Sequence, residues 1–319
     1  MKVAASPQSI NRAMPEGGIQ VTSHQSLVTP NPQSLIPSYS SPVTKEGGQT
    51  MRNYHYAKAG EVMYHTGLTK EHLAGARYAV VPGDPGRVPG LAKALDPSAA
   101  FLTSHRDYTS WLARVSGEPV LVMSTGMGGP CMSFAVEELA RLGVTTFLRV
   151  GTTGSIQEGL ELGDLVINRA SVRRDGASKA YAPAEYPAAA DMTVTLALMK
   201  AAESLKVPHQ VGVSISTDSF WPGQERYDSF SGYVRTSYRG LLSDFQAMGC
   251  TNFEMENATL FTLASVMGLR AGSVCGVVAK RTESESIAPR EVYALAEERF
   301  QKTVRRALEM LIGHFMVTM

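Results

Sequence analysis

The chain has 319 residues, 44% of them hydrophobic, with 30 basic and 29 acidic side chains and a formal charge of +1. This length and composition can bury a large core, which excludes a disordered protein and a small disulfide-stapled one, and the three cysteines contain no C-x-x-C pair. The near-zero charge lacks the basic excess of proteins that bind a nucleic acid, so we expect no nucleic-acid partner.

Residues 1–52 are rich in Ser, Pro, Gln and Gly and contain no Phe, Trp or Cys. Their apolar residues follow neither the helix nor the strand period, so we predict a flexible extension over residues 1–60 and a single domain over residues 61–319. The acid-poor extension leaves a mitochondrial targeting role open. No hydrophobic run reaches the roughly 20 residues of a membrane-spanning helix, and we expect a cytoplasmic protein without a membrane partner.

From Gly67 onward, short apolar β-branched runs alternate with helical segments, which predicts an α/β domain with a largely buried sheet. We expect strands at residues 78–81, 120–123, 146–150, 164–167, 211–215 and 272–278. Helices are predicted at residues 134–142, 193–205, 258–267 and from 289 to the end of the chain.

Ligands of α/β sheets collect beyond the carboxyl ends of the strands, so the residues there are the candidate site. The first strand runs into a Pro-Gly-Asp-Pro-Gly-Arg turn ending at Arg87, which suits an anion or a solvated surface turn equally well. Arg149 lies inside an apolar strand, and Gly-Thr-Thr-Gly follows. A buried guanidinium needs a carboxylate or a phosphate, and because the nearest acid along the chain is Glu158, we favour phosphate.

Three further segments carry glycine or polar residues at informative positions. The Gly-rich run at 124–130 fits neither the dinucleotide nor the P-loop spacing, which favours close backbone packing. Gln224 and Arg226 follow an aromatic pair and could read the amide edge of a flat ring, although physics alone favours an ordinary exposed loop. Glu256 precedes an apolar helix and could bind a diol, but helix capping is the simpler interpretation. Neither H-E-x-x-H nor G-x-S-x-G occurs.

Together these segments resemble the uridine phosphorylases of the nucleoside phosphorylase family. The similarity runs from His65-Thr66-Gly67 to Arg281-Thr282, and a Gly-Gln-x-Arg segment at 223–226 is what separates these enzymes from purine-cleaving relatives. Between its ends the similarity passes through 82–85, 104–106, 136–139, 149–154, 171–173, 222–227 and 254–256. It implies an α/β fold: one domain with a central mixed, partly barrel-like β-sheet flanked by helices.

The resemblance implies reversible phosphorolysis of uridine, and of deoxyuridine or thymidine where the site tolerates them, to uracil and ribose 1-phosphate in pyrimidine salvage. Such a pentosyltransferase needs no cofactor, because inorganic phosphate is the co-substrate. Catalytic roles fall to Arg149, Gln224 and Arg226, and Glu254 and Arg281 are further members of the site. The implied phosphate ligands are Gly83, Arg87, Arg106, Arg149 and Thr152, the ribose ligands His65, Met255 and Glu256, and the base contacts Thr153, Gly154, Phe220, Gln224, Arg226 and Val278.

The resemblance also implies a shared site, with Arg106 and His65 reaching in from a neighbouring subunit. At least a homodimer is therefore expected, and a hexamer stays open. Bacterial relatives can hold a monovalent cation at the dimer interface, and the matching positions here are Asp107, the Met127 carbonyl and Cys131. The shorter carboxylate and the thiol differ from the usual glutamate and serine, although a carboxylate still suits a hard cation.

Three alternatives remain open from the sequence. A nucleosidase of the same fold would not need three phosphate-binding arginines. A purine nucleoside phosphorylase should place an acid near the end of the last strand, where this chain has Lys280-Arg281. A nucleoside-binding module without turnover would keep the base and ribose contacts only. Phosphate-dependent release of uracil discriminates among them.

Overall fold

The computed structural model describes residues 54–317, so the expected flexible extension and its targeting role fall almost entirely outside the described residues. At the start of this range, the Tyr54 hydroxyl donates to the Met267 carbonyl (2.7 Å) and the Ala57 N–H donates to the Arg141 carbonyl (2.9 Å). The domain boundary at residue 60 stays a prediction. Across residues 54–317, no helix combines the length and the hydrophobicity needed to cross a membrane.

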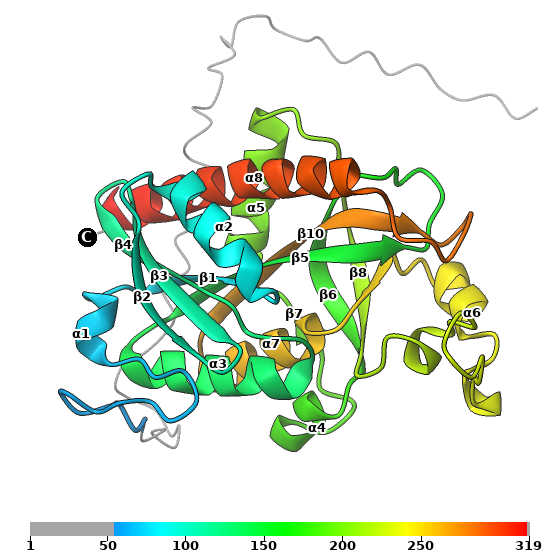
Figure 1. The fold of residues 1–319 in the computed structure, drawn as a ribbon, viewed down its shortest axis with the longest axis horizontal. Coiled ribbons are helices and arrows are strands. Elements are labelled where there is room, and N and C mark those ends of the chain that lie inside the picture. The colour runs from blue at the N-terminus through cyan, green and yellow to red at the C-terminus, as the bar shows by residue number, and fades with distance from the viewer. Residues whose placement is uncertain (1–53, 318–319) are drawn as a thin grey trace, which may run out of the picture. The chain divides into compact units, whose positions relative to one another are not determined.

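A single mixed sheet organises the domain, and part of it closes into a ring (Figure 1). Because β10 pairs with both β5 and β6, five strands form a closed barrel, which confirms the expected mixed, partly barrel-like sheet. The barrel order is β5 (Thr146–Ser155), β9 (Asn252–Glu254), β8 (His209–Thr217), β6 (Leu165–Arg174) and β10 (Arg270–Lys280). From β5 the sheet continues through β1 (Tyr78–Pro82), β4 (Glu118–Met123), β3 (Tyr108–Val115) and β2 (Ala100–His105), and β7 (Ala188–Ala189) pairs with β6.

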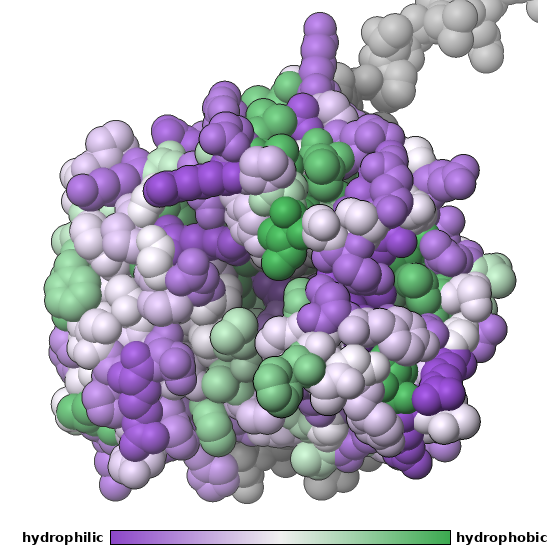
Figure 2. Space-filling view, turned by 45° about the vertical axis from the view of Figure 1, so that its right-hand side comes forward, coloured by the Kyte–Doolittle hydropathy of each residue, from purple (hydrophilic) through white to green (hydrophobic). Residues whose placement is uncertain are grey.

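Helices cover both faces of this sheet (Figure 1). Alternate residues of β1 point into the two cores, Tyr78 and Val80 into one and Ala79 and Val81 into the other, which explains why the whole strand is apolar. One core contains α2 (Val88–Leu95), α5 (Met192–Ser204) and α8 (Arg290–Val317), and the other α1 (Lys70–Leu73), α3 (Gly129–Leu142) and α7 (Asn257–Met267). The short α4 (Ala177–Tyr181) packs Tyr181 against the second core, and α6 (Leu241–Ala247) packs Phe245 in a smaller core with Phe253. The surface turned forward in Figure 2 mixes hydrophilic and hydrophobic residues and is hollowed near its centre.

All six predicted strands and all four predicted helices are present. Strand β5 is longer than expected, because it continues through the Gly-Thr-Thr-Gly segment to Ser155 instead of ending at Val150. On one side, β5 pairs with β1 up to Val150 and with β9 from Gly154 onward, while β10 pairs along its other side. The backbone of residues 151–153 is therefore left open to a ligand on the β1 and β9 side.

Two glycines of β10 let helices approach the barrel closely. A Cβ atom added at Gly272 would lie 2.5 Å from Val194 Cγ1 of α5, and one at Gly276 would lie 2.6 Å from Ala296 Cβ of α8. Real Cβ atoms do not approach so closely, so glycine at these positions sets the distance between the sheet and its helices.

We predict that Gly276→Ala lowers the free energy of unfolding by about 1–3 kcal/mol, because the added methyl group overpacks the contact with α8. Gly90→Ala is the matched control. Gly90 lies in α2 with no atom within 4 Å of an added Cβ, so alanine should be neutral or stabilise by up to about 1 kcal/mol. Urea denaturation measures both variants, and equal stability of the two would contradict the packing argument.

Candidate active site

A cavity of about 240 Å³ lies beyond the carboxyl ends of β1 and β4 and beside the ends of β5, β9 and β10. All predicted phosphate, ribose and base contacts except His65 and Arg106 line it, whereas Arg281 does not. These residues are Gly83, Arg87, Arg149, Thr152, Thr153, Gly154, Phe220, Gln224, Arg226, Met255, Glu256 and Val278, and Glu254 is with them. The expectation that ligands bind beyond the carboxyl ends of the strands thus led to the cavity, while the role of each residue stays a prediction.

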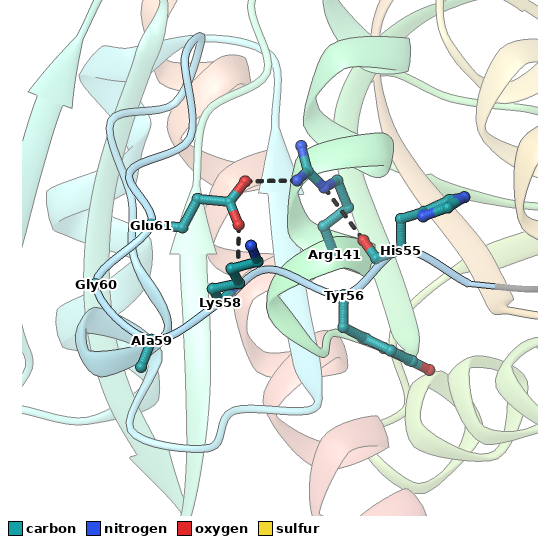
Figure 3. Close-up of a pocket in the computed structure, with 7 residues that line it drawn as sticks. All are labelled: His55, Tyr56, Lys58, Ala59, Gly60, Glu61 and Arg141. Carbon is teal, nitrogen blue, oxygen red and sulfur yellow. Dashed lines mark hydrogen bonds and ion pairs between the residues drawn. The ribbon is translucent and has the colours of Figure 1, made fainter.

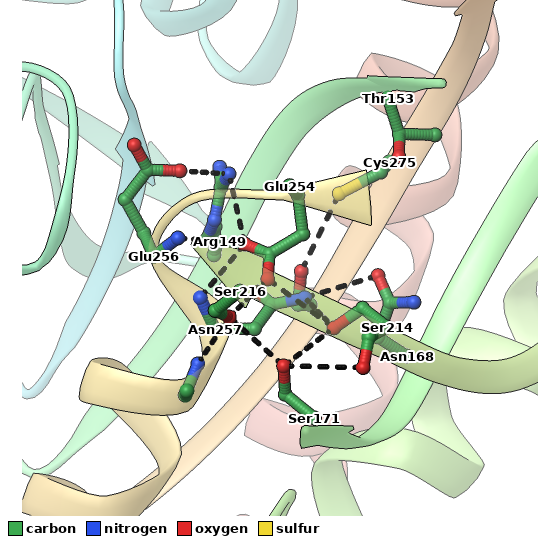
Figure 4. A network of polar contacts seen from close by, with 12 residues as sticks. Arg149, Thr153, Asn168, Ser171, Ser214, Ser216, Glu254, Glu256, Asn257 and Cys275 are labelled. Carbon is green, nitrogen blue, oxygen red and sulfur yellow. Dashed lines mark hydrogen bonds and ion pairs between the residues drawn. The ribbon is translucent and has the colours of Figure 1, made fainter. Parts of the chain in front are cut away.

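Arg149 is 4% exposed and faces two carboxylates (Figure 4). Its Nη2 atom forms one ion pair with Glu256. It forms a second ion pair, 3.4 Å long, with Glu254. The expectation that no protein carboxylate lies near Arg149 was therefore wrong, because it considered only acids nearby in the sequence, while phosphate binding at Arg149 stays a prediction. The partners lie 105 and 107 residues further along the chain. Burial opposes the charge of Arg149, but Glu256 and Glu254 raise its pKa above the ordinary value.

Glu254, rather than Glu256, caps helix α7. Its Oε2 atom accepts the N–H groups of Glu256 and Asn257, each at 2.8 Å, and Ser216 donates to its Oε1 atom. Glu256 makes no capping hydrogen bond, so the capping interpretation of Glu256 was wrong. Its carboxylate turns instead toward Arg149 and accepts the Gly128 N–H at 2.6 Å. The turn that carries Met255 and Glu256 is therefore held by the hydrogen bonds of Glu254 on one side and by the contacts of Glu256 with Arg149 and Gly128 on the other.

The interior of the barrel is polar, and its side chains form one connected network (Figure 4). From Asn257, a chain of amide hydrogen bonds runs to Asn168 (3.1 Å), then to Asn252 (2.8 Å) and then to the Thr153 hydroxyl (2.8 Å). The network links the α7 N-terminus to a residue of the cavity wall. The sequence analysis missed it, although Ser and Asn at inward positions of β6 and β8 were its available signal.

Gln224 and Arg226 are buried, at 4% and 2% exposed, so the interpretation of an ordinary exposed loop was wrong for these two residues. The Arg226 guanidinium lies over the Phe220 ring, 4.4 Å from its centroid, and its Nη1 atom forms an ion pair with Glu285 at 2.9 Å. Burial and the neighbouring Arg281 lower the pKa of Arg226. The arrangement places a desolvated guanidinium beside an aromatic ring on the cavity wall.

Arg281 joins the Gln224 loop to the segment that follows β10. It donates to the Gln224 carbonyl at 2.6 Å and forms two hydrogen bonds of 2.8 Å with the Glu285 carboxylate. Glu285 therefore bridges Arg226 and Arg281. Sequence analysis missed Glu285, because nothing in its neighbourhood marks a site residue.

His65 and Arg106 lie outside the cavity and close to each other. The His65 ring stacks on Phe134 at 4.1 Å and its Nδ1 atom contacts Glu138 at 2.7 Å. Arg106 lies over the ring of Tyr64, 5.0 Å from the centroid. Both residues predicted to act on a neighbouring subunit thus share one patch of surface.

The Gly-rich loop after β4 packs closely, as predicted. A Cβ atom at Gly129 would lie 2.5 Å from the Thr259 hydroxyl oxygen. At Gly126 it would lie 3.1 Å from Asp107 Cβ and 3.3 Å from Cys131 Cβ, so these two candidate cation ligands are neighbours. Burial raises the pKa of Cys131, which keeps its thiol protonated and a poor ligand for a hard cation. Residues 54–317 contain no cluster of three His, Cys, Asp or Glu suited to a metal ion, and the interface cation stays a prediction.

A second, more open pocket of about 550 Å³ lies beside the end of α3 (Figure 3). Arg141 forms an ion pair with Glu61 there at 2.6 Å and donates to the His55 carbonyl at 3.2 Å. None of the predicted site residues lines it, so the smaller cavity is the candidate site.

Comparison with known proteins agrees with this geometry. Residues 77–309 match the family model of the Phosphorylase superfamily. The chain belongs to this superfamily. It is 52% identical over 223 residues to the uridine phosphorylases of Haemophilus influenzae and Escherichia coli, covering 70% of this chain and 88% of each relative. The uridine phosphorylase of Thermococcus kodakarensis is 47% identical over 249 residues, which cover 78% of this chain and 83% of the relative.

We predict that Arg149→Ala destabilises the domain more at pH 8 than at pH 5. Burial already raises the pKa of Glu254 although Arg149 opposes the rise, so removal of Arg149 should raise it further. A carboxyl group whose folded pKa exceeds its unfolded pKa costs stability as the pH rises through the folded value. We expect a loss of about 3 kcal/mol at pH 8, measured by urea denaturation, and a smaller loss at pH 5.

Arg305→Ala is the control for this pair of measurements, because it removes an exposed arginine that pairs with Glu309. Its effect should stay within about 0.5 kcal/mol at both pH values. An Arg149→Ala loss that is the same at pH 5 and pH 8 would contradict the two-carboxylate argument.

Proposed function

We propose that the chain is a uridine phosphorylase, which cleaves uridine with inorganic phosphate to uracil and ribose 1-phosphate. One observation carries the proposal: two buried arginines of one cavity, Arg149 and Arg226, each keep an Nε–H donor without a partner in residues 54–317. A buried donor without a partner costs about 1–3 kcal/mol, so each suits an acceptor on a ligand. The similarity to relatives named uridine phosphorylase supports the choice of substrate.

Phosphate is assigned to the part of the cavity around Arg149 and Arg87. Gly83 and Thr152 lie beside them, and the unpaired backbone edge of residues 151–153 adds donors there. The neighbouring Glu256 carboxylate and the Met255 backbone suit the ribose hydroxyls, since a carboxylate accepts two hydrogen bonds from a diol.

The uracil ring is assigned to Phe220, Gln224 and Arg226. Cleavage of the bond between the ribose and uracil leaves positive charge on the sugar and negative charge on the base. Phosphate fixed below the anomeric carbon attacks that carbon and stabilises the first charge, and the Arg226 guanidinium stabilises the second at a uracil oxygen. Because both substrates are held in one cavity, the encounter is oriented and no covalent enzyme intermediate is needed.

We infer that the active form is at least a homodimer. His65 and Arg106 lie together outside the cavity, where they could serve the site of a second copy. A hexamer, an interface cation and a cytoplasmic location stay predictions.

We predict that uracil appears from uridine only when inorganic phosphate is present, together with ribose 1-phosphate. Chromatography of reactions with and without phosphate measures both products, with inosine and adenosine as competing substrates. Uracil release without phosphate would identify a nucleosidase, and preferred cleavage of inosine a purine enzyme. The second outcome needs testing because a guanosine phosphorylase of Halorubrum lacusprofundi is 38% identical over 199 residues, 62% of this chain and 76% of that relative.

Arg226→Ala should lower kcat/KM for uridine by about 100-fold, because a preorganised donor to the leaving base is lost. The KM for phosphate should change less than about threefold, as the phosphate contacts lie elsewhere in the cavity. Arg235→Ala is the matched control, an exposed arginine of the same loop that stacks on Tyr238. A defect confined to phosphate would contradict the base assignment.

A further inference from the structure

Arg87 is held in place by residues of helix α8. Its Nε atom forms an ion pair with Glu297 Oε1 at 2.9 Å, and the Tyr293 ring lies 5.9 Å from its Cζ atom. Asp84, the cap of the short turn at Pro85–Arg87, lies further away, at 3.9 Å from Nε. The side chain of Arg87 is 16% exposed, so most of its surface is covered by these contacts.

Tyr293 and Glu297 are four residues apart and therefore lie on one face of α8. Tyr293 also lines the cavity. The helix is anchored in the core by Phe300, Val304 and Leu308, all at most 1% exposed. The two groups that hold Arg87 are thus mounted on a rigid element, although more than 200 residues separate them from Arg87 in the sequence.

The contact with Glu297 leaves part of the Arg87 guanidinium unused. The ion-pair distances of Glu297 and Asp84 both run to the Nε atom, and the Nη atoms donate no hydrogen bond in the part of the chain that the structure describes. A guanidinium binds a planar or tetrahedral oxyanion through two N–H groups at once. A carboxylate at Nε therefore fixes the group without occupying its Nη donors.

We propose that Glu297 is a positioning residue for the phosphate site and acts through Arg87. The inference rests on the proposed function, which assigns phosphate to this part of the cavity. Holding the long Arg87 side chain in one conformation before phosphate arrives removes an ordering cost from binding. The negative charge of Glu297 opposes phosphate, but the side chain is 33% exposed and solvent screens this repulsion.

Two variants separate the positioning contact from the charge. Glu297→Ala removes both, and we expect it to raise the Kd and the KM for inorganic phosphate by about threefold to tenfold, the cost of ordering one side chain. Glu297→Gln removes the charge but keeps an oxygen in the place of the carboxylate oxygen that lies 2.9 Å from Arg87 Nε, so its Kd should stay within about twofold of the unmodified chain. The KM for uridine should change less than about twofold in both. Calorimetry with phosphate alone gives Kd, and initial rates give KM and kcat.

Glu298→Ala and Glu298→Gln are the matched controls. Glu298 is the next residue of α8 and makes an exposed ion pair with Lys302, away from the cavity lining. Both should leave the Kd for phosphate unchanged. This comparison separates a local effect on Arg87 from a general effect of removing charge from the helix.

Two outcomes would overturn the proposal. Tighter phosphate binding in both Glu297 variants would mean that the carboxylate competes with phosphate. An unchanged Kd in Glu297→Ala, with or without a lower melting temperature, would mean a structural role only. If the unmodified chain binds phosphate but never cleaves uridine, and Glu297→Ala still weakens phosphate more than Glu297→Gln does, the proposed function fails while the positioning role stands.

Discussion

The ion cluster of Arg149 with Glu254 and Glu256 is the interaction on which the rest of the site depends. A guanidinium inside the barrel is stable only with a countercharge, and the two carboxylates supply it from the end of β9 and the start of α7. Glu254 then fixes the α7 N-terminus, and Glu256 holds the Gly128 N–H at the start of α3. One buried charge thereby ties β5, β9, α7 and α3 together around the cavity.

The geometry of β5 explains why the cavity lies where it does. β5 continues past the end of β1, and β9 takes over the pairing only from Gly154. The backbone between these two neighbours has strand geometry without a strand partner on that side. A ligand there meets N–H groups held rigidly by the pairing with β10. The closed barrel thus leaves backbone groups of β5 without a strand partner on one side, next to the buried Arg149.

Much of the fold could be predicted from the sequence. The apolar run of β1 is buried along its whole length, and the apolar residues Phe300, Val304 and Leu308 of α8 are buried along one side of that helix. The strands β2 and β3 could not be predicted, because they are partly exposed and lack a long apolar run. The three-residue strand β9 exists only through its pairing with β5 and β8. The composition of the cavity wall followed from the resemblance. What the sequence could not reveal is which carboxylate faces which arginine, because those partners meet only after the chain has folded.

The three arginines of the cavity follow one physical rule. Each is held by carboxylates from another part of the fold, and within the described residues the Nε–H donors of Arg149 and Arg226 and the Nη donors of Arg87 form no hydrogen bond. The pairs are Arg149 with Glu254 and Glu256, Arg226 with Glu285, and Arg87 with Glu297. A carboxylate on one edge neutralises part of the charge and restricts the side chain, while the free donors keep their direction. The carboxylates weaken the attraction of each arginine for an anion. In return, the arginine side chain hardly has to move when an anion binds or when negative charge develops on the substrate. A site built in this way favours oriented transition-state stabilisation over the tightest binding of phosphate in the ground state.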